Sequence, residues 1–164
     1  MHTDTPDFIE KHTYLKAPLA RVWAAISRAE EFGLWFGMRF DNPPFEVGKH
    51  MKGFIVPTTV NADVAAMQKN YEGTPIDWVV IAIEPETLLQ LSWHPYALKK
   101  DYDYSVEPMT LISFKLTECE GGVDLRVTES GFNQIPLDRR AEALRANDGG
   151  WAKQMELIEA YLAL

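Results

Sequence analysis

The sequence predicts an α+β domain in which an antiparallel sheet is covered on one face by a long carboxy-terminal helix. Residues 112–128 contain two stretches of alternating apolar and polar residues, separated by a Gly-Gly turn, which is typical of a hairpin with one buried face. Residues 136–164 carry four large apolar residues at helical spacing, and this stripe would cover that face. The four are Trp151, Met155, Ile158 and Leu162.

The remaining elements follow from local patterns along the chain. We expect strands at Phe8–Leu15, Lys49–Val56, Pro75–Glu84 and Leu88–Trp93, the last two forming a hairpin. One helix begins at Pro18, and a short second helix carries Phe32, Trp35 and Phe36 and stops at Gly37. Within the 57–74 excursion, Asp63–Lys69 could form two helical turns capped by Asn61. Gly149-Gly150 predicts that the final helix kinks or divides.

Composition limits the classes of function. The 164 residues carry a net charge of -8 and are 46% hydrophobic, so we expect one domain spanning residues 1–164 with a substantial core. The acidic balance argues against nucleic acid as a partner. No apolar run is long enough for a membrane span, and residues 1–11 lack the pattern of a secretory signal, so we expect a cytoplasmic protein.

Residues with catalytic or metal-binding chemistry form no recognisable motif. The four histidines lack metal-ligand spacing, and the single Cys119 lies in an acidic stretch that disfavours a thiolate, so we expect no metal, cofactor or cysteine nucleophile. His94 opens the 94–108 loop and is interpreted as a surface residue. Glu129, Glu156 and Glu159 could face a cavity, but the last two lie off the apolar stripe and should be solvated.

Six segments resemble, in order, the family of activator of heat-shock-protein-90 ATPase homologues in its stand-alone bacterial form. They are APLARVWAAI (17–26), EFGLWF (31–36), FEVGKHMKG (45–53), IEPETLLQLSW (83–93), VTESGF (127–132) and GGWAKQMELIEAYL (149–162). The resemblance implies the START-like (SRPBCC), Bet v-like helix-grip fold, a curved sheet around the final helix with two short helices after the first strand. The 57–74 and 94–108 segments are longer than this resemblance implies, which suggests a modified cavity entrance.

In this fold a cavity lies between the sheet and the final helix, so the resemblance implies an apolar pocket lined by aromatic and methionine side chains. Most such residues are ordinary core, but those on the apolar sheet face and helix stripe are candidate ligand contacts. The candidates are Trp35, Phe36, Met38, Phe40, Phe54, Trp78, Trp93, Phe114, Trp151 and Met155. Polar contacts at the entrance would come from Tyr96, Tyr102 or Tyr104.

Three functions remain open at this point. The leading hypothesis is a non-enzymatic binder of a hydrophobic or aromatic small molecule, because aromatic rings occur here without a catalytic constellation. The second is a co-chaperone-like protein that stimulates a chaperone ATPase, as the resemblance implies. The third is a cyclase, dehydratase or hydrolase that uses His94, a tyrosine or a buried acid for proton transfer. The chain is expected to act as a monomer or a homodimer.

Overall fold

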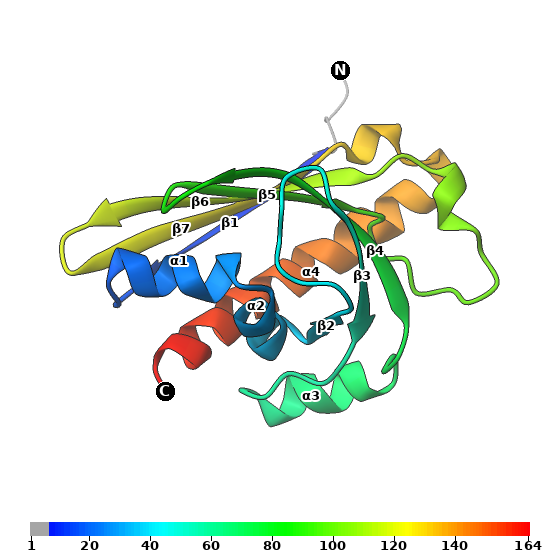
Figure 1. The fold of residues 1–164 in the computed structure, drawn as a ribbon. Coiled ribbons are helices and arrows are strands. Elements are labelled where there is room, and N and C mark those ends of the chain that lie inside the picture. Colours follow the sequence, from blue (N-terminus) through cyan, green and yellow to red (C-terminus); the bar gives the residue numbers. More distant parts are fainter. Residues whose placement is uncertain (1–6) are drawn as a thin grey trace, which may run out of the picture.

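The computed structural model, which describes residues 7–164, contains one curved seven-stranded antiparallel sheet with the order β1-β7-β6-β5-β4-β3-β2. Three helices, α1, α2 and α4, lie on its concave side (Figure 1). The strands are β1 (Phe8–Leu15), β2 (Met38–Phe40), β3 (His50–Ile55), β4 (Pro75–Glu84), β5 (Leu88–Trp93), β6 (Thr110–Cys119) and β7 (Gly122–Ser130). The helices are α1 (Leu19–Ser27), α2 (Ala29–Phe36), α3 (Ala62–Lys69) and α4 (Leu137–Leu162). This arrangement confirms the predicted helix-grip fold.

The two predicted hairpins and the alternation of apolar and polar residues in the second are confirmed in the sheet. In the β6–β7 hairpin Phe114 lies opposite Val127 and Leu116 opposite Leu125, and all four side chains are buried. Arg126, between two of them, is exposed. The β4–β5 hairpin pairs Trp78 with Trp93. Alternation with a period of two therefore directs one face of these strands to the core.

The two short helices after β1 close one end of the concave face. Gly37 ends α2 with φ 91°, a left-handed conformation that glycine adopts without steric cost, and its amide donates to Gly33 O at 2.9 Å. A side chain at Gly33 is excluded, because its Cβ would lie 2.0 Å from Met38 O. The chain therefore turns tightly from α2 into β2. The Asn61 side chain caps α3 by accepting the Val64 amide at 2.9 Å, as predicted.

The final helix, which Gly149-Gly150 predicts to kink or divide, is continuous from Leu137 to Leu162, so the predicted division is wrong. Both glycines are exposed, and a Cβ at either would meet no atom of residues 7–164 within 4 Å. The turns on either side are held by packing, with Ala143 and Trp151 buried, and this outweighs the low helix propensity of glycine.

The expectation that residues 1–11 lack a secretory signal concerns mainly residues 1–6, which lie outside the described residues. In residues 7–164, no helix is both long enough and apolar enough to cross a membrane. The same residues hold no group of three or more histidine, cysteine or acidic side chains suited to a metal ion.

Candidate ligand-binding site

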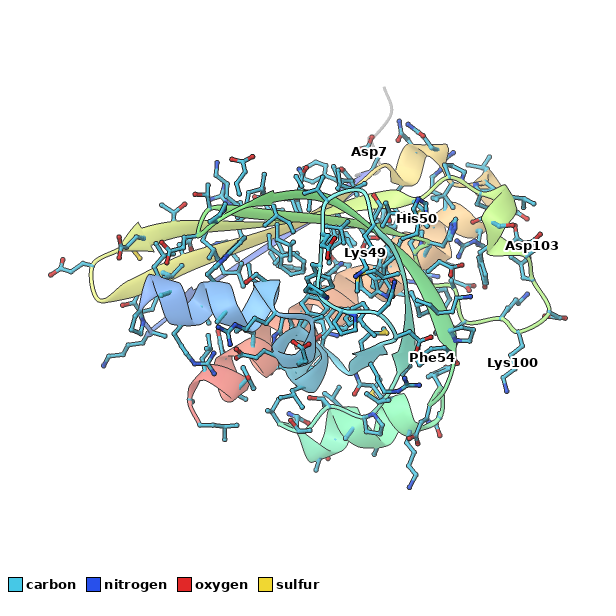
Figure 2. The ribbon with its side chains drawn as sticks, viewed as in Figure 1. Asp7, Lys49, His50, Phe54, Lys100 and Asp103 are labelled. Carbon is cyan, nitrogen blue, oxygen red and sulfur yellow. The ribbon has the colours of Figure 1, made fainter. Side chains whose placement is uncertain are left out.

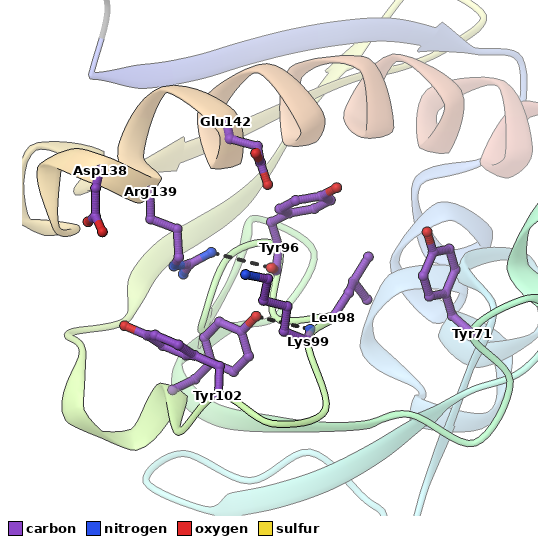
Figure 3. A pocket seen from close by; sticks show the side chains of 9 residues that line it. Tyr71, Tyr96, Leu98, Lys99, Tyr102, Asp138, Arg139 and Glu142 are labelled. Atoms are coloured by element: carbon purple, nitrogen blue, oxygen red, sulfur yellow. Dashed lines mark hydrogen bonds between the residues drawn. The ribbon is translucent and has the colours of Figure 1, made fainter.

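A pocket of about 380 Å³ opens between the 94–108 loop, the first turns of α4 and the segment after α3 (Figure 3). We call it the tyrosine pocket. It is lined by Tyr71, Tyr96, Leu98, Lys99, Tyr102, Tyr104, Asp138, Arg139 and Glu142. All three tyrosines that the sequence placed at an entrance contribute to its wall. Tyr71, Arg139 and Glu142 were not predicted, because their elements meet the loop only in the folded chain.

A buried ion pair fixes the loop side of the pocket to α4. Arg139 donates from Nη2 and Nε to Glu107 Oε1 at 2.7 and 3.0 Å, and the Glu107 side chain is 1% exposed. Tyr102 also donates to Glu107 Oε2, at 2.5 Å. Burial by itself raises the pKa of Glu107, but the hydrogen bonds from Arg139 and Tyr102 outweigh it and hold the pKa below its ordinary value.

The same contacts immobilise two of the tyrosine rings. The Tyr102 and Tyr104 rings lie 4.6 Å apart between centroids, and the Arg139 guanidinium lies 4.9 Å from the Tyr104 ring centre. The Tyr104 hydroxyl accepts the Lys99 amide at 3.1 Å. Hydrogen bonding to Glu107, together with burial, raises the pKa of the Tyr102 phenol, so it remains a donor at neutral pH.

Tyr96 has a strained backbone at the centre of this wall. Its φ is 53°, in the left-handed region that is rare for a bulky residue, and Arg139 Nη1 donates to its carbonyl oxygen at 3.3 Å. Such conformations persist only where the surroundings hold them, and they gather at functional sites. The Tyr96 side chain lines the pocket (Figure 3).

His94 is buried, at 8% exposed, so its interpretation as a surface residue is wrong. It follows the last residue of β5 and lines a second pocket of about 300 Å³ that shares Lys99, Tyr102 and Tyr104 with the first. Its Nδ1 has no hydrogen-bond partner within residues 7–164. Burial is the main cause of the lowered pKa of His94. Lys100 and Asp103 project from the tip of the loop (Figure 2).

Most of the ten predicted contact residues form a single cluster of touching rings between the sheet and α4. Phe32, which was not predicted, lies at its centre within 6.1 Å of six other rings. Seven of the ten belong to it, namely Trp35, Phe36, Phe40, Trp78, Trp93, Phe114 and Trp151. None of these lines the tyrosine pocket. Their role as ligand contacts stays a prediction.

The other three predicted residues lie apart from these rings in different ways. Met155 is buried on α4 and Met38 on β2. Met38 and Phe40 line a third, mainly apolar pocket of about 350 Å³ beside α2. Phe54 lies on the face of β3 opposite Met51, with the Arg39 guanidinium 4.8 Å from its ring centre, so the structure does not bring it to the ring cluster.

Glu129 sits inside the fold with a fully buried carboxylate and four donors around it. Oε2 accepts from Trp93 Nε1 at 2.7 Å and Thr110 Oγ1 at 2.6 Å. Oε1 accepts from Trp151 Nε1 at 2.8 Å and Asn147 Nδ2 at 2.9 Å. One carboxylate therefore joins the sheet to α4. The sequence named Glu129 as a residue that could face inward, whereas Glu156 and Glu159 are exposed, as predicted.

The comparisons with known proteins agree with this architecture. Residues 16–163 match the family model described as Activator of Hsp90 ATPase homolog 1-like protein. The chain belongs to this family. It lies in the START-like, SRPBCC superfamily. No curated protein matches the chain.

Solved structures share the fold of this family member. A Mesorhizobium loti protein, MLL2253, is 25% identical with a TM-score of 0.67, and the match covers 95% of this chain and 96% of that one. DynU16, a putative protein of the dynemicin biosynthetic locus, is 19% identical (TM-score 0.68, 97% of this chain), and the chain spans about half, 48%, of its length. CalU16 from Micromonospora echinospora is 16% identical (TM-score 0.59, 94% and 75% covered).

Proposed function

We propose that this protein binds a hydrophobic or aromatic small molecule, without chemical change, at the tyrosine pocket between the 94–108 loop and α4. The observation that carries the proposal is the pocket itself, a hollow of about 380 Å³ with four tyrosines in its wall. That volume falls in the range of small-molecule sites, which combine apolar and aromatic walls with a few polar groups. Family membership supports the same class of function.

The internal support of the pocket also favours binding. The Arg139–Glu107 pair and the ring contacts hold Tyr102 and Tyr104 before any ligand arrives, so little side-chain entropy is lost on binding. The hydroxyls of Tyr102 and Tyr104 form hydrogen bonds, whereas those of Tyr71 and Tyr96 form none within residues 7–164 and are free to orient a ligand. The strained Tyr96 backbone is consistent with such a role.

The rings of the cluster contact one another between the sheet and α4, and none of Trp78, Trp93, Phe114 and Trp151 lines the tyrosine pocket. Trp78 and Trp93 lie 4.8 Å apart, and Phe114 and Trp151 lie 5.7 Å apart between ring centres. A ligand reaching these rings would have to separate them. We therefore place the primary contacts in the tyrosine pocket, and the proposal takes the whole chain as one cytoplasmic domain.

A thermal-shift screen tests this proposal. The melting temperature of the full chain is measured against a library of hydrophobic and aromatic compounds, and native mass spectrometry gives the stoichiometry of each hit. Hits should raise the melting temperature of the wild type and of Tyr14→Ala, a half-exposed tyrosine on β1, but not of Tyr71→Ala or Tyr96→Ala. Equal shifts in all four proteins would contradict binding at the tyrosine pocket.

A further inference from the structure

The ligand's charge can be inferred from which groups in the tyrosine pocket are already engaged. Arg139 lines the pocket, but its guanidinium already donates to Glu107 and to the Tyr96 carbonyl oxygen and lies over the Tyr104 ring. The Glu107 carboxylate balances its charge at 2.7 Å. Arg139 is therefore a wall of the pocket rather than a site for an anion.

The groups left for a ligand favour a positive charge. Asp138 and Glu142 line the pocket on exposed positions of α4 and form no ion pair within the described chain. Lys99 is the one lining cation without such a pair in residues 7–164. Among the described residues, the lining therefore offers two unpaired carboxylates and one unpaired ammonium group, which favours a cationic ligand. The net charge of -8 on the whole protein also attracts cations.

The aromatic walls add a second, independent preference. The face of a tyrosine ring carries partial negative charge and attracts cations that lie within about 6 Å of its centre. One ring of this wall already does so, because the Arg139 guanidinium lies 4.9 Å from the centre of Tyr104. Among residues 7–164, no cation lies over the Tyr71 or Tyr96 ring in this way. Their side chains stand on the two sides of the open space, as Figure 3 shows.

We infer that the ligand of the tyrosine pocket is an aromatic or apolar molecule bearing a positively charged nitrogen. Its apolar part lies against Leu98 and the Tyr71 and Tyr96 rings, and its nitrogen lies toward Glu142. This inference rests on the proposed function and narrows it to one chemical class. Lys99 acts against the cation, so its charge should weaken binding.

Three probes with one phenethyl group test the inference. Phenethylammonium, phenethyl alcohol and hydrocinnamate carry a cation, a neutral hydroxyl and an anion on the same ring and chain. Each is titrated into the full chain by calorimetry and by NMR of tyrosine side chains. The ammonium should bind about threefold or more tighter than the alcohol, which matches a single exposed cation–π contact, and the carboxylate should bind weakest.

Removing a negative or a positive charge from the pocket should change the affinity for phenethylammonium in opposite directions. Glu142→Gln should weaken phenethylammonium about threefold and leave phenethyl alcohol unchanged, whereas Lys99→Gln should strengthen the ammonium. Glu156→Gln, exposed farther along α4, is the matched control and should change neither. All three positions are exposed, so folding should be retained.

The possible results separate this inference from the proposed function. Alcohol and ammonium binding equally at Tyr71 and Tyr96 would overturn the charge preference and leave a pocket for neutral ligands. Tighter binding of hydrocinnamate, lost in Lys99→Gln, would overturn it in favour of an anion. If no probe binds, the inference fails, and the library screen then decides the proposed function by itself.

Discussion

Replacing Glu129 with glutamine tests how strongly one carboxylate joins α4 to the sheet. A glutamine amide has only one oxygen that can accept. If its nitrogen takes the place of Oε1, the Trp151 and Asn147 donors of α4 lose their acceptor. If the nitrogen instead lies toward Trp93 and Thr110, the Thr110 hydroxyl can turn to accept from it, so only the Trp93 indole N–H is left unsatisfied. At roughly 1–3 kcal/mol for each unsatisfied donor, Glu129→Gln should lower the free energy of unfolding by about 2–4 kcal/mol.

Urea unfolding followed by tryptophan fluorescence measures this loss, because Trp93 and Trp151 both donate to Glu129. The exposed Glu156→Gln should change the unfolding free energy by no more than about 0.5 kcal/mol. A loss below about 1 kcal/mol in Glu129→Gln, with the slope of the transition unchanged, would refute the reasoning. It would show that the four donors find other partners at little cost.

Three further predictions follow from the loop, the ion pair and the glycines. Burial lowers the pKa of His94 in the folded state below 6.5, so the unfolded state binds the extra proton first as the pH falls. The free energy of unfolding should therefore be highest above pH 6.5 and should decrease as the pH falls through 6.5. The melting temperature of His94→Gln should depend less on pH between about pH 8 and 5 than that of the wild type, and an equal dependence in both proteins would contradict this. Glu107→Gln should cost about 3 kcal/mol by urea unfolding, because Arg139 would remain buried without its partner, whereas the exposed Asp103→Asn should have little effect. Gly149→Ala should stabilise α4 by about 0.5–1 kcal/mol, and a loss of stability in this variant would contradict a continuous helix at that position. Gly37→Ala should destabilise the protein by more than about 1 kcal/mol because the φ of Gly37 is 91°, and an unchanged stability would contradict this.

The fold could be predicted from the sequence because its elements are locally consistent. Strand β1 and both hairpins occur where alternation and turns predicted them, and Gly37 ends α2 as expected. The continuity of α4 could not be predicted, since glycine propensity is a local property whereas the packing of Ala143 and Trp151 is tertiary.

The candidate site was harder to predict than the fold. Tyr96, Tyr102 and Tyr104 could be placed together because they share one loop, but the partners of that loop come from α4 and from the segment after α3. The burial of His94 depends on tertiary packing, which no periodicity in the loop records. Glu129 occupies a buried register position in β7, and only the four donors around it explain why a charged group is tolerated there.

Intermolecular nuclear Overhauser effects between a bound phenethyl probe and the protein test the central claim most directly. The account predicts contacts from the probe's ring protons to the side chains of Tyr71, Tyr96 and Leu98, at one molecule per chain. Contacts confined to Trp78, Phe114 or Trp151 would contradict it, because the ligand would then lie among the inner rings.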